Sequence, residues 1–155
     1  MNRKQLSLFT FVLLLFTGFI LGGCKKGDDN NGGGSNLEKN MKFTFTTTGL
    51  QATDDFDITI AGGDIQGTAT TMFKVNGAVQ NNQRTITISR QQLMAGQVIV
   101  ETTTPLYTLA MSAGGFSGTT GHTFTFKMEP VIDGSAKTVI TETIGTSVFA
   151  KQYSY

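Results

Sequence analysis

The sequence is poor in the residues that build metal centres and covalent crosslinks. Among 155 residues there is one cysteine, Cys24, and one histidine, His122, with no tryptophan and only 2 prolines. A single cysteine excludes an internal disulfide and a cysteine-cluster metal site, and a single histidine excludes a multi-histidine zinc site. Charged residues make up 15% of the chain and the formal net charge is +1. Such a balance provides no field to hold a polyanion, so we expect no nucleic-acid partner.

The first 23 residues have the pattern of an export signal. Arg3 and Lys4 precede an apolar run at residues 6–21, which is shorter than the about 20 residues that a membrane-spanning helix needs. Two glycines and Cys24 follow this run directly. A signal anchor with an incidental cysteine, or a membrane-spanning helix, is the alternative interpretation.

The four residues Leu21-Gly22-Gly23-Cys24 resemble the lipobox of bacterial lipoproteins, with leucine first and small residues before the cysteine. The resemblance implies that a diacylglycerol is attached to the Cys24 thiol, that the chain is cleaved before Cys24, and that the new amino terminus is acylated. A thiol is the nucleophile that lipid transfer requires. Two or three acyl chains then hold the protein at a membrane without any spanning helix, because each buried methylene contributes about 0.8 kcal/mol.

Residues 24–40 are predicted to form a flexible tether. Leu37 is the one large apolar side chain in residues 25–40, and a Gly-Gly-Gly-Ser stretch precedes it. Such a segment buries too little apolar surface to offset the entropy of ordering it. The stretch KKGDD at residues 25–29 also resembles the tethers of Bacteroidetes lipoproteins, in which early acidic residues accompany export to the outer face of the outer membrane. The resemblance favours surface display over a periplasm-facing location, and a merely solubilising spacer is the alternative.

Residues 41–155 are predicted to form one all-β domain. Apolar and polar residues alternate through most of this region, as a strand with one dry and one wet face requires. We expect strands at residues 41–46, 56–60, 68–75, 84–89, 97–102, 106–113, 122–128, 137–144 and 147–153. About eight or nine antiparallel strands of this length predict a two-sheet β-sandwich with Greek-key or immunoglobulin-like connections. A small β-barrel is the alternative.

Turn chemistry supports this prediction. Asn76-Gly77 and Asp133-Gly134 have the residues that hairpin turns favour, and Gly62-Gly63 is expected to separate two strands. Residues 114–121 are expected to form a longer flexible loop. Ser89 and Gln92 have capping-box spacing, and Gly96 follows at the end, so we expect one helical turn there. The predicted inward set is Phe43, Phe45, Phe56, Ile58, Ile60, Phe73, Val75, Ile86, Ile88, Val98, Val100, Leu109, Met111, Phe124, Phe126 and Met128.

Candidate metal ligands are confined to one acidic concentration, which contains Asp54, Asp55, Asp57 and Asp64. Asp55 and Asp57 share a strand face, and Asp64 would join them across a Gly62-Gly63 turn. Calcium needs six to eight oxygen ligands and this spacing matches no known calcium loop. Solvated charges that discourage edge pairing are therefore the favoured interpretation, and we expect no cofactor other than the covalent lipid.

Candidate ligand contacts are aromatic. Phe116 lies between glycines and serine in the predicted loop, and Tyr153 and Tyr155 share a face of the last strand. The tyrosines are either a binding platform or part of the packing against the core. No catalytic pattern is present, since a serine nucleophile needs an oriented base and His122 is interpreted as a structural or surface residue.

The sequence therefore predicts a lipid-anchored, non-enzymatic envelope lipoprotein that binds an unknown ligand, either a glycan or an envelope protein. The alternative is a carbohydrate-binding accessory lipoprotein of a surface glycan-uptake system.

Replacing the lipid attachment site tests the anchor. Cys24→Ala should abolish incorporation of a labelled fatty acid and move the protein from the membrane fraction to the aqueous fraction, because the nucleophile is gone. Metabolic labelling followed by detergent phase separation measures both effects. Continued labelling of the variant would show that the anchor lies elsewhere.

Overall fold

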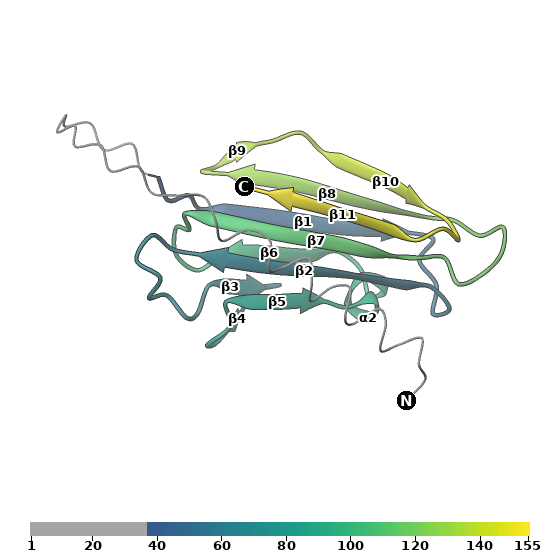
Figure 1. Cartoon of the computed structure of the whole chain (residues 1–155), viewed down its shortest axis with the longest axis horizontal. Coiled ribbons are helices and arrows are strands. Elements are labelled where there is room, and N and C mark those ends of the chain that lie inside the picture. The colour runs from purple at the N-terminus through teal and green to yellow at the C-terminus, as the bar shows by residue number, and fades with distance from the viewer. Residues whose placement is uncertain (1–36) are drawn as a thin grey trace, which may run out of the picture. The chain divides into compact units, whose positions relative to one another are not determined.

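The computed structural model describes residues 37–155, which form a sandwich of two antiparallel sheets (Figure 1). The larger, 7-stranded sheet has the order β10-β8-β1-β6-β3-β4, with β9 also paired to β8, and the 4-stranded sheet has the order β11-β7-β2-β5. The strands are β1 (Met41–Thr48), β2 (Asp55–Gly63), β3 (Phe73–Val75), β4 (Ala78–Gln80), β5 (Thr85–Ile88), β6 (Val98–Thr102), β7 (Thr108–Phe116), β8 (Phe124–Ile132), β9 (Ser135–Ala136), β10 (Ile140–Ile144) and β11 (Phe149–Ser154).

The two-sheet sandwich is thus confirmed, and the alternative of a small barrel is not what the chain forms. Strands that are neighbours in a sheet are mostly distant in sequence, because the chain crosses between the layers. Residues 37–155 form eleven strands rather than eight or nine. The strands β4 and β9 were not predicted, because they span 3 and 2 residues and are too short to show an alternating pattern.

The core lies between the sheets and is built by the alternating strands. On β1 the side chains of Met41, Phe43 and Phe45 are buried while the intervening residues are only partly covered. Phe43 lies opposite Val100 of β6 and Pro130 of β8. Every residue of the predicted inward set is buried except Val75, which is partly buried against the core. Further buried residues include Met72, Leu93, Leu106, Ala113, Ile132 and Ile144.

The predicted helical turn is α2 (Arg90–Met94). The Ser89 side chain accepts a hydrogen bond from the Gln92 backbone N–H, and the Gln92 side chain accepts one from the Ser89 N–H, which completes the capping box. Gly96 follows the helix with φ of +136°. Leu93 is buried, so this single turn covers one end of the core.

Two of the three predicted turns form as expected. Asn76 and Gly77 have φ of 49° and 81°, and Asp133 and Gly134 have φ of 50° and 76°. Positive φ at both central positions is the conformation of a type I′ hairpin turn. Val75 pairs with Ala78 and Ile132 pairs with Ser135 across these turns.

The prediction that Gly62-Gly63 is a turn was wrong, because both glycines lie inside β2 and pair with Leu109 and Thr108 of β7. A Cβ on Gly62 would lie 2.7 Å from Leu106 Cδ1 and 3.0 Å from Phe73 Cζ. Core side chains therefore occupy the space that a side chain at position 62 would need. Glycine is required here by close packing and not by a turn.

The prediction of a flexible loop at residues 114–121 was also wrong in part. Gly114, Gly115 and Phe116 belong to β7, and the residues after them pack closely on the segment before β2. A Cβ on Gly115 would lie 1.9 Å from the Asp55 carbonyl oxygen, and one on Gly118 would lie 1.8 Å from that of Thr53. The glycines permit two backbones to touch.

The fold begins slightly before Met41, within the last residues of the predicted tether. Lys39 and Leu106 exchange backbone hydrogen bonds of 2.8 and 2.9 Å. The remainder of the tether, the signal and Cys24 lie outside the described residues, so those predictions stand untested. Within residues 37–155 no helix has the length and apolar character to cross a membrane.

Candidate functional site

A β-bulge interrupts the edge of the larger sheet. The register of β9 with β8 pairs Val131 with Ala136, whereas β10 resumes with Ile140 opposite Met128. This change of register leaves one extra residue on the edge strand between Lys137 and Ile140. Lys137 itself still follows the β9 register, because its N–H donates to the Pro130 carbonyl at 2.9 Å. Bulges bend a strand and redirect its side chains, and they are frequent beside functional sites.

An open groove of about 710 Å³ lies at this bulge. Its lining comes from the bulged edge, from the chain before β1 and from the residue that follows β11: Lys39, Ile132, Asp133, Ser135, Lys137, Thr138, Ile140 and Tyr155. The groove therefore spans the gap between the β10 edge of the larger sheet and the β11 edge of the smaller one.

Tyr155 forms the aromatic part of the groove. Its backbone exchanges hydrogen bonds of 2.9 and 3.0 Å with Leu109, and its ring packs edge-on against Phe43 with centroids 5.0 Å apart. Burial raises the pKa of the Tyr155 hydroxyl, and the neighbouring Tyr153 raises it further. The phenol is therefore protonated at neutral pH and can donate a hydrogen bond into the groove.

The polar groups of the groove are mainly donors. Lys39 and Lys137 supply ammonium groups, and Ser135 and Thr138 supply hydroxyls. The one carboxylate, Asp133, is already engaged, since its Oδ1 accepts the Asn40 N–H at 2.9 Å. This combination suits a ligand that carries hydroxyls and a negative charge.

The aromatic residues predicted as ligand contacts do not come together. Tyr153 and Tyr155 share a face of the last strand as expected, but that face is turned inward and both rings pack against the core. Tyr153 is partly buried, and burial, followed by the charge of Glu142, raises the pKa of its hydroxyl. Phe116 is 36% exposed and pairs with Asp55 at the other end of the sandwich. Only Tyr155 of the three lines the groove.

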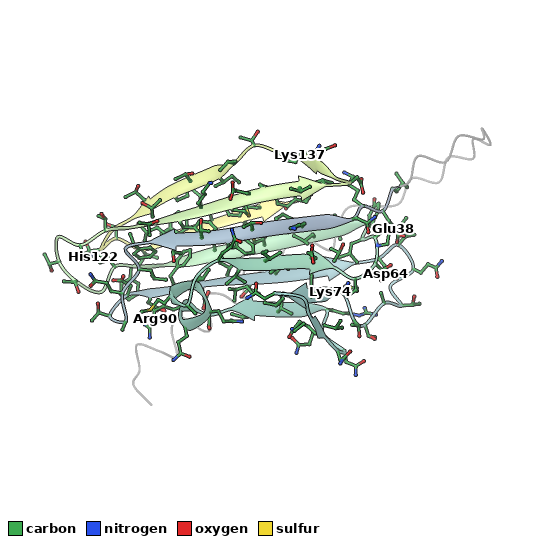
Figure 2. The ribbon with its side chains drawn as sticks, turned by 180° about the vertical axis from the view of Figure 1, so that it is seen from behind. Glu38, Asp64, Lys74, Arg90, His122 and Lys137 are labelled. Carbon is green, nitrogen blue, oxygen red and sulfur yellow. The ribbon has the colours of Figure 1, made fainter. Side chains whose placement is uncertain are left out.

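Asp54 is a structural carboxylate rather than an exposed one. It is fully buried. Its Oδ2 accepts the Gln51 N–H at 2.8 Å and lies 3.2 Å from His122 Nε2, while its Oδ1 accepts the Gly118 N–H at 3.0 Å. The guanidinium of Arg90 donates to the Asp54 backbone carbonyl. One side chain thus joins three segments at this end of the sandwich, where Figure 2 shows His122 and Arg90.

The pKa of Asp54 reflects these contacts. Burial acts to raise it, but the Gln51 and Gly118 N–H groups and the His122 imidazole outweigh burial and hold the pKa below its ordinary value of 3.8. His122 therefore has a structural role, which is one of the two alternatives that the sequence left open.

The other predicted metal ligands are divided between the two ends of β2. Asp55 and Asp57 are exposed on one face, as predicted, whereas Asp64 follows the far end of the strand. At about 3.3 Å per residue, roughly 23–30 Å separates Asp64 from Asp57 and Asp55. Because Gly62-Gly63 is not a turn, nothing folds Asp64 back. Among residues 37–155, no group of three or more histidine, cysteine, aspartate or glutamate side chains is placed to hold a metal ion.

Lys39, Lys137 and Thr138 were not among the residues predicted to contact a ligand. One signal was available, because Val139 and Ile140 are adjacent apolar residues that break the alternation of the surrounding segment. A break of this kind marks a bulge. The distance between the bulge and Tyr155 depends on sheet packing, which the local pattern does not contain.

No protein-family model matches the chain, and no curated protein is similar to it. Solved structures share its fold. A protein from Parabacteroides distasonis, determined by NMR in its calcium-bound form, has a TM-score of 0.60 and 14% identity, over 82% of this chain and 99% of that protein. A domain of unknown function, DUF4425, from Bacteroides vulgatus has a TM-score of 0.60 and 10% identity, over 77% of this chain and 94% of that domain. A DUF4425 family protein from Bacteroides ovatus has a TM-score of 0.56 and 11% identity, over 76% of this chain and 94% of that protein.

Replacing Asp54 or Asp57 by asparagine should change the free energy of unfolding in opposite directions. Asp54→Asn should destabilise the domain by about 1–3 kcal/mol at pH 7, because buried N–H donors lose an acceptor. The pKa of Asp54 is lowered in the fold, so this stabilisation is present above its ordinary value and is lost as the pH falls toward the folded pKa. Burial, followed by the charge of Asp55, raises the pKa of Asp57, so Asp57→Asn should slightly increase stability at pH 7. Urea unfolding of both variants between pH 3 and pH 7 measures this, and a wild-type unfolding curve for Asp54→Asn would contradict it.

Proposed function

We propose that this protein is a lipid-anchored, non-enzymatic binding module of the bacterial cell envelope, and that the groove at the bulged edge holds its ligand. The observation that carries the proposal is the donor set of Lys39, Lys137 and Thr138 beside the Tyr155 ring. An aromatic ring offers a face or edge to a sugar ring, while ammonium and hydroxyl groups fix its polar substituents. The ligand class is therefore an acidic glycan.

The anchoring part of the proposal rests on the sequence around Cys24. A short apolar run followed by Leu-Gly-Gly-Cys supports lipid attachment. The resemblance of residues 25–29 to Bacteroidetes tethers supports display at the outer face of the outer membrane. The origin of the structural neighbours in Bacteroides and Parabacteroides agrees with that resemblance. A glycan-binding lipoprotein at this location would serve as an accessory of a surface glycan-uptake system.

The lining of the groove supports binding rather than hydrolysis. Glycoside hydrolysis needs two carboxyl groups about 5–9 Å apart on either side of the bond that breaks. The groove contains the single carboxylate of Asp133, which holds the Asn40 backbone. His122 is bonded to Asp54 at the other end of the sandwich, away from the groove.

Paired double variants test the groove. Lys137→Ala with Thr138→Val should weaken binding of acidic glycans about tenfold or more, because an ammonium and a hydroxyl contact are lost. Lys74→Ala with Thr141→Val removes the same groups from two positions that do not line the groove and should leave the affinity unchanged. A glycan array identifies the ligand and calorimetry gives the dissociation constants. Equal affinities for both double variants would exclude the groove as the site.

Calcium binding is a second candidate, favoured by the calcium-bound form of the Parabacteroides protein. Asp55 and Asp57 lie two residues apart on the exposed face of β2, so a cation could bridge them. Burial, followed by the charge of Asp55, raises the pKa of Asp57. Water molecules and backbone carbonyls would complete the oxygen ligands.

Calcium should then raise the melting temperature by several degrees, and a chelator should reverse the shift. Asp55→Asn with Asp57→Asn should abolish the shift, whereas Glu101→Gln with Glu129→Gln, on the other sheet, should retain it. A melting temperature that is the same with calcium and with chelator would exclude this candidate.

A further inference from the structure

Three large apolar side chains are exposed together where the chain enters the domain. Leu37 is 57% exposed, Ile65 is 55% exposed and Tyr107 is 54% exposed. They come from the segment before β1, the turn after β2 and the segment before β7. We call these three residues the tip patch.

Hydrogen bonds hold the three segments side by side. The Ile65 N–H donates to Glu38 Oε1 at 2.9 Å, and the Tyr107 N–H donates to the Gly63 carbonyl at 2.9 Å. Lys39 and Leu106 form a backbone bridge beside them. Figure 2 shows Glu38 and Asp64 at this end, opposite His122 and Arg90. The three segments that carry the tip patch are therefore held together at one end of the sandwich.

The turn that carries Ile65 is held in place by its own contacts. Asp64 Oδ2 accepts the N–H groups of Thr68 and Ala69 at 3.0 and 3.2 Å, and the Gly67 N–H donates to the Asp64 carbonyl at 3.2 Å. Arg84 donates to the Gly67 carbonyl at 2.6 Å. Ile65 is thus kept at the surface by a hydrogen-bonded turn, although more than half of the residue is exposed.

We propose that the tip patch is the membrane-facing surface of the domain and rests on the lipid bilayer that the anchor occupies. This inference rests on the proposed lipid attachment at Cys24. Only residues 25–36 separate Cys24 from Leu37, and a Gly-rich segment of that length has a root-mean-square reach of roughly 20 Å. The Asp55 end of β2 lies roughly 30 Å from the tip, so the tip is the end that the anchor holds close to the membrane.

The composition of the tip fits a lipid surface. Leucine and isoleucine side chains enter the boundary between headgroups and acyl chains, and tyrosine favours the headgroup level. Lys39 and Arg84 are exposed beside the patch and can pair with lipid phosphates. The carboxylates of Glu38 and Asp64 accept backbone N–H groups within the domain. Because the anchor supplies a high local concentration, a weak contact suffices to orient the domain.

A single-cysteine label tests the orientation in the complete lipoprotein. Lipid occupies Cys24, the one native cysteine, so Ile65→Cys can be labelled selectively with a nitrobenzoxadiazole fluorophore. Val148→Cys is the reference, since Val148 is 77% exposed in the turn between β10 and β11. The proteins are reconstituted into vesicles of phosphatidylethanolamine and phosphatidylglycerol in a 3:1 ratio.

Nitroxide-labelled lipid should quench the fluorophore at position 65 at least about twofold more than the one at position 148. Leu37→Ser with Tyr107→Ser should remove this difference, whereas Val79→Ser with Met94→Ser should preserve it. Circular dichroism melts of every variant establish that the fold is retained. Equal quenching at positions 65 and 148 in the folded parent would overturn the inference.

Flotation of the vesicles separates this inference from the proposed anchor. If the protein floats with the vesicles and position 65 is not quenched preferentially, the anchor stands and the orientation is wrong. If the protein does not float, lipid attachment at Cys24 fails and the orientation fails with it.

Discussion

Contact between phenylalanine rings from the two sheets is the interaction on which the rest of the structure depends. Phe56 of the smaller sheet packs against Phe124 and Phe126 of the larger one, with centroids 5.4 and 5.3 Å apart. Phe126 continues the stack to Phe45, and Phe45 to Phe43. The chain has one cysteine, so no internal disulfide joins the two sheets, and this buried aromatic surface stabilises their packing. Both the groove and the loop network around Asp54 are placed by sheets held in this way.

The two ends of the sandwich differ in chemistry. Around Asp54, buried polar groups bond one another and join the loops to the sheets. The opposite end contains both the groove and the tip patch. Lys39 lines the groove and lies beside the tip patch. A ligand in the groove would therefore lie close to the surface that we place on the membrane. The chain would hold its ligand beside the envelope rather than far out in the medium.

The sequence was sufficient to predict the sandwich and most of its core, because alternation places Phe43, Phe45 and Ile58 on the dry face without reference to any other strand. The capping box at Ser89 and the turn at Asn76-Gly77 were predictable for the same reason, since each depends on a few adjacent residues. Gly62 was misread because local rules associate paired glycines with turns, whereas its space is limited by Leu106 and Phe73. The groove was not predicted because Lys137 and Tyr155, which both line it, belong to different sheets, and the local sequence pattern does not show how the sheets pack.

The close contacts at Gly115 and Gly118 limit how this domain can change over time. Charged residues on the outer faces are free to be replaced, and so are many core residues if their volume is conserved. At these two glycines even one methyl group would coincide with a backbone carbonyl oxygen, that of Asp55 at the start of β2 or that of Thr53 just before it. When diverged chains of this fold are aligned, these positions are better reference points than the acidic or aromatic residues, and a side chain found there would indicate that the two backbones have moved apart.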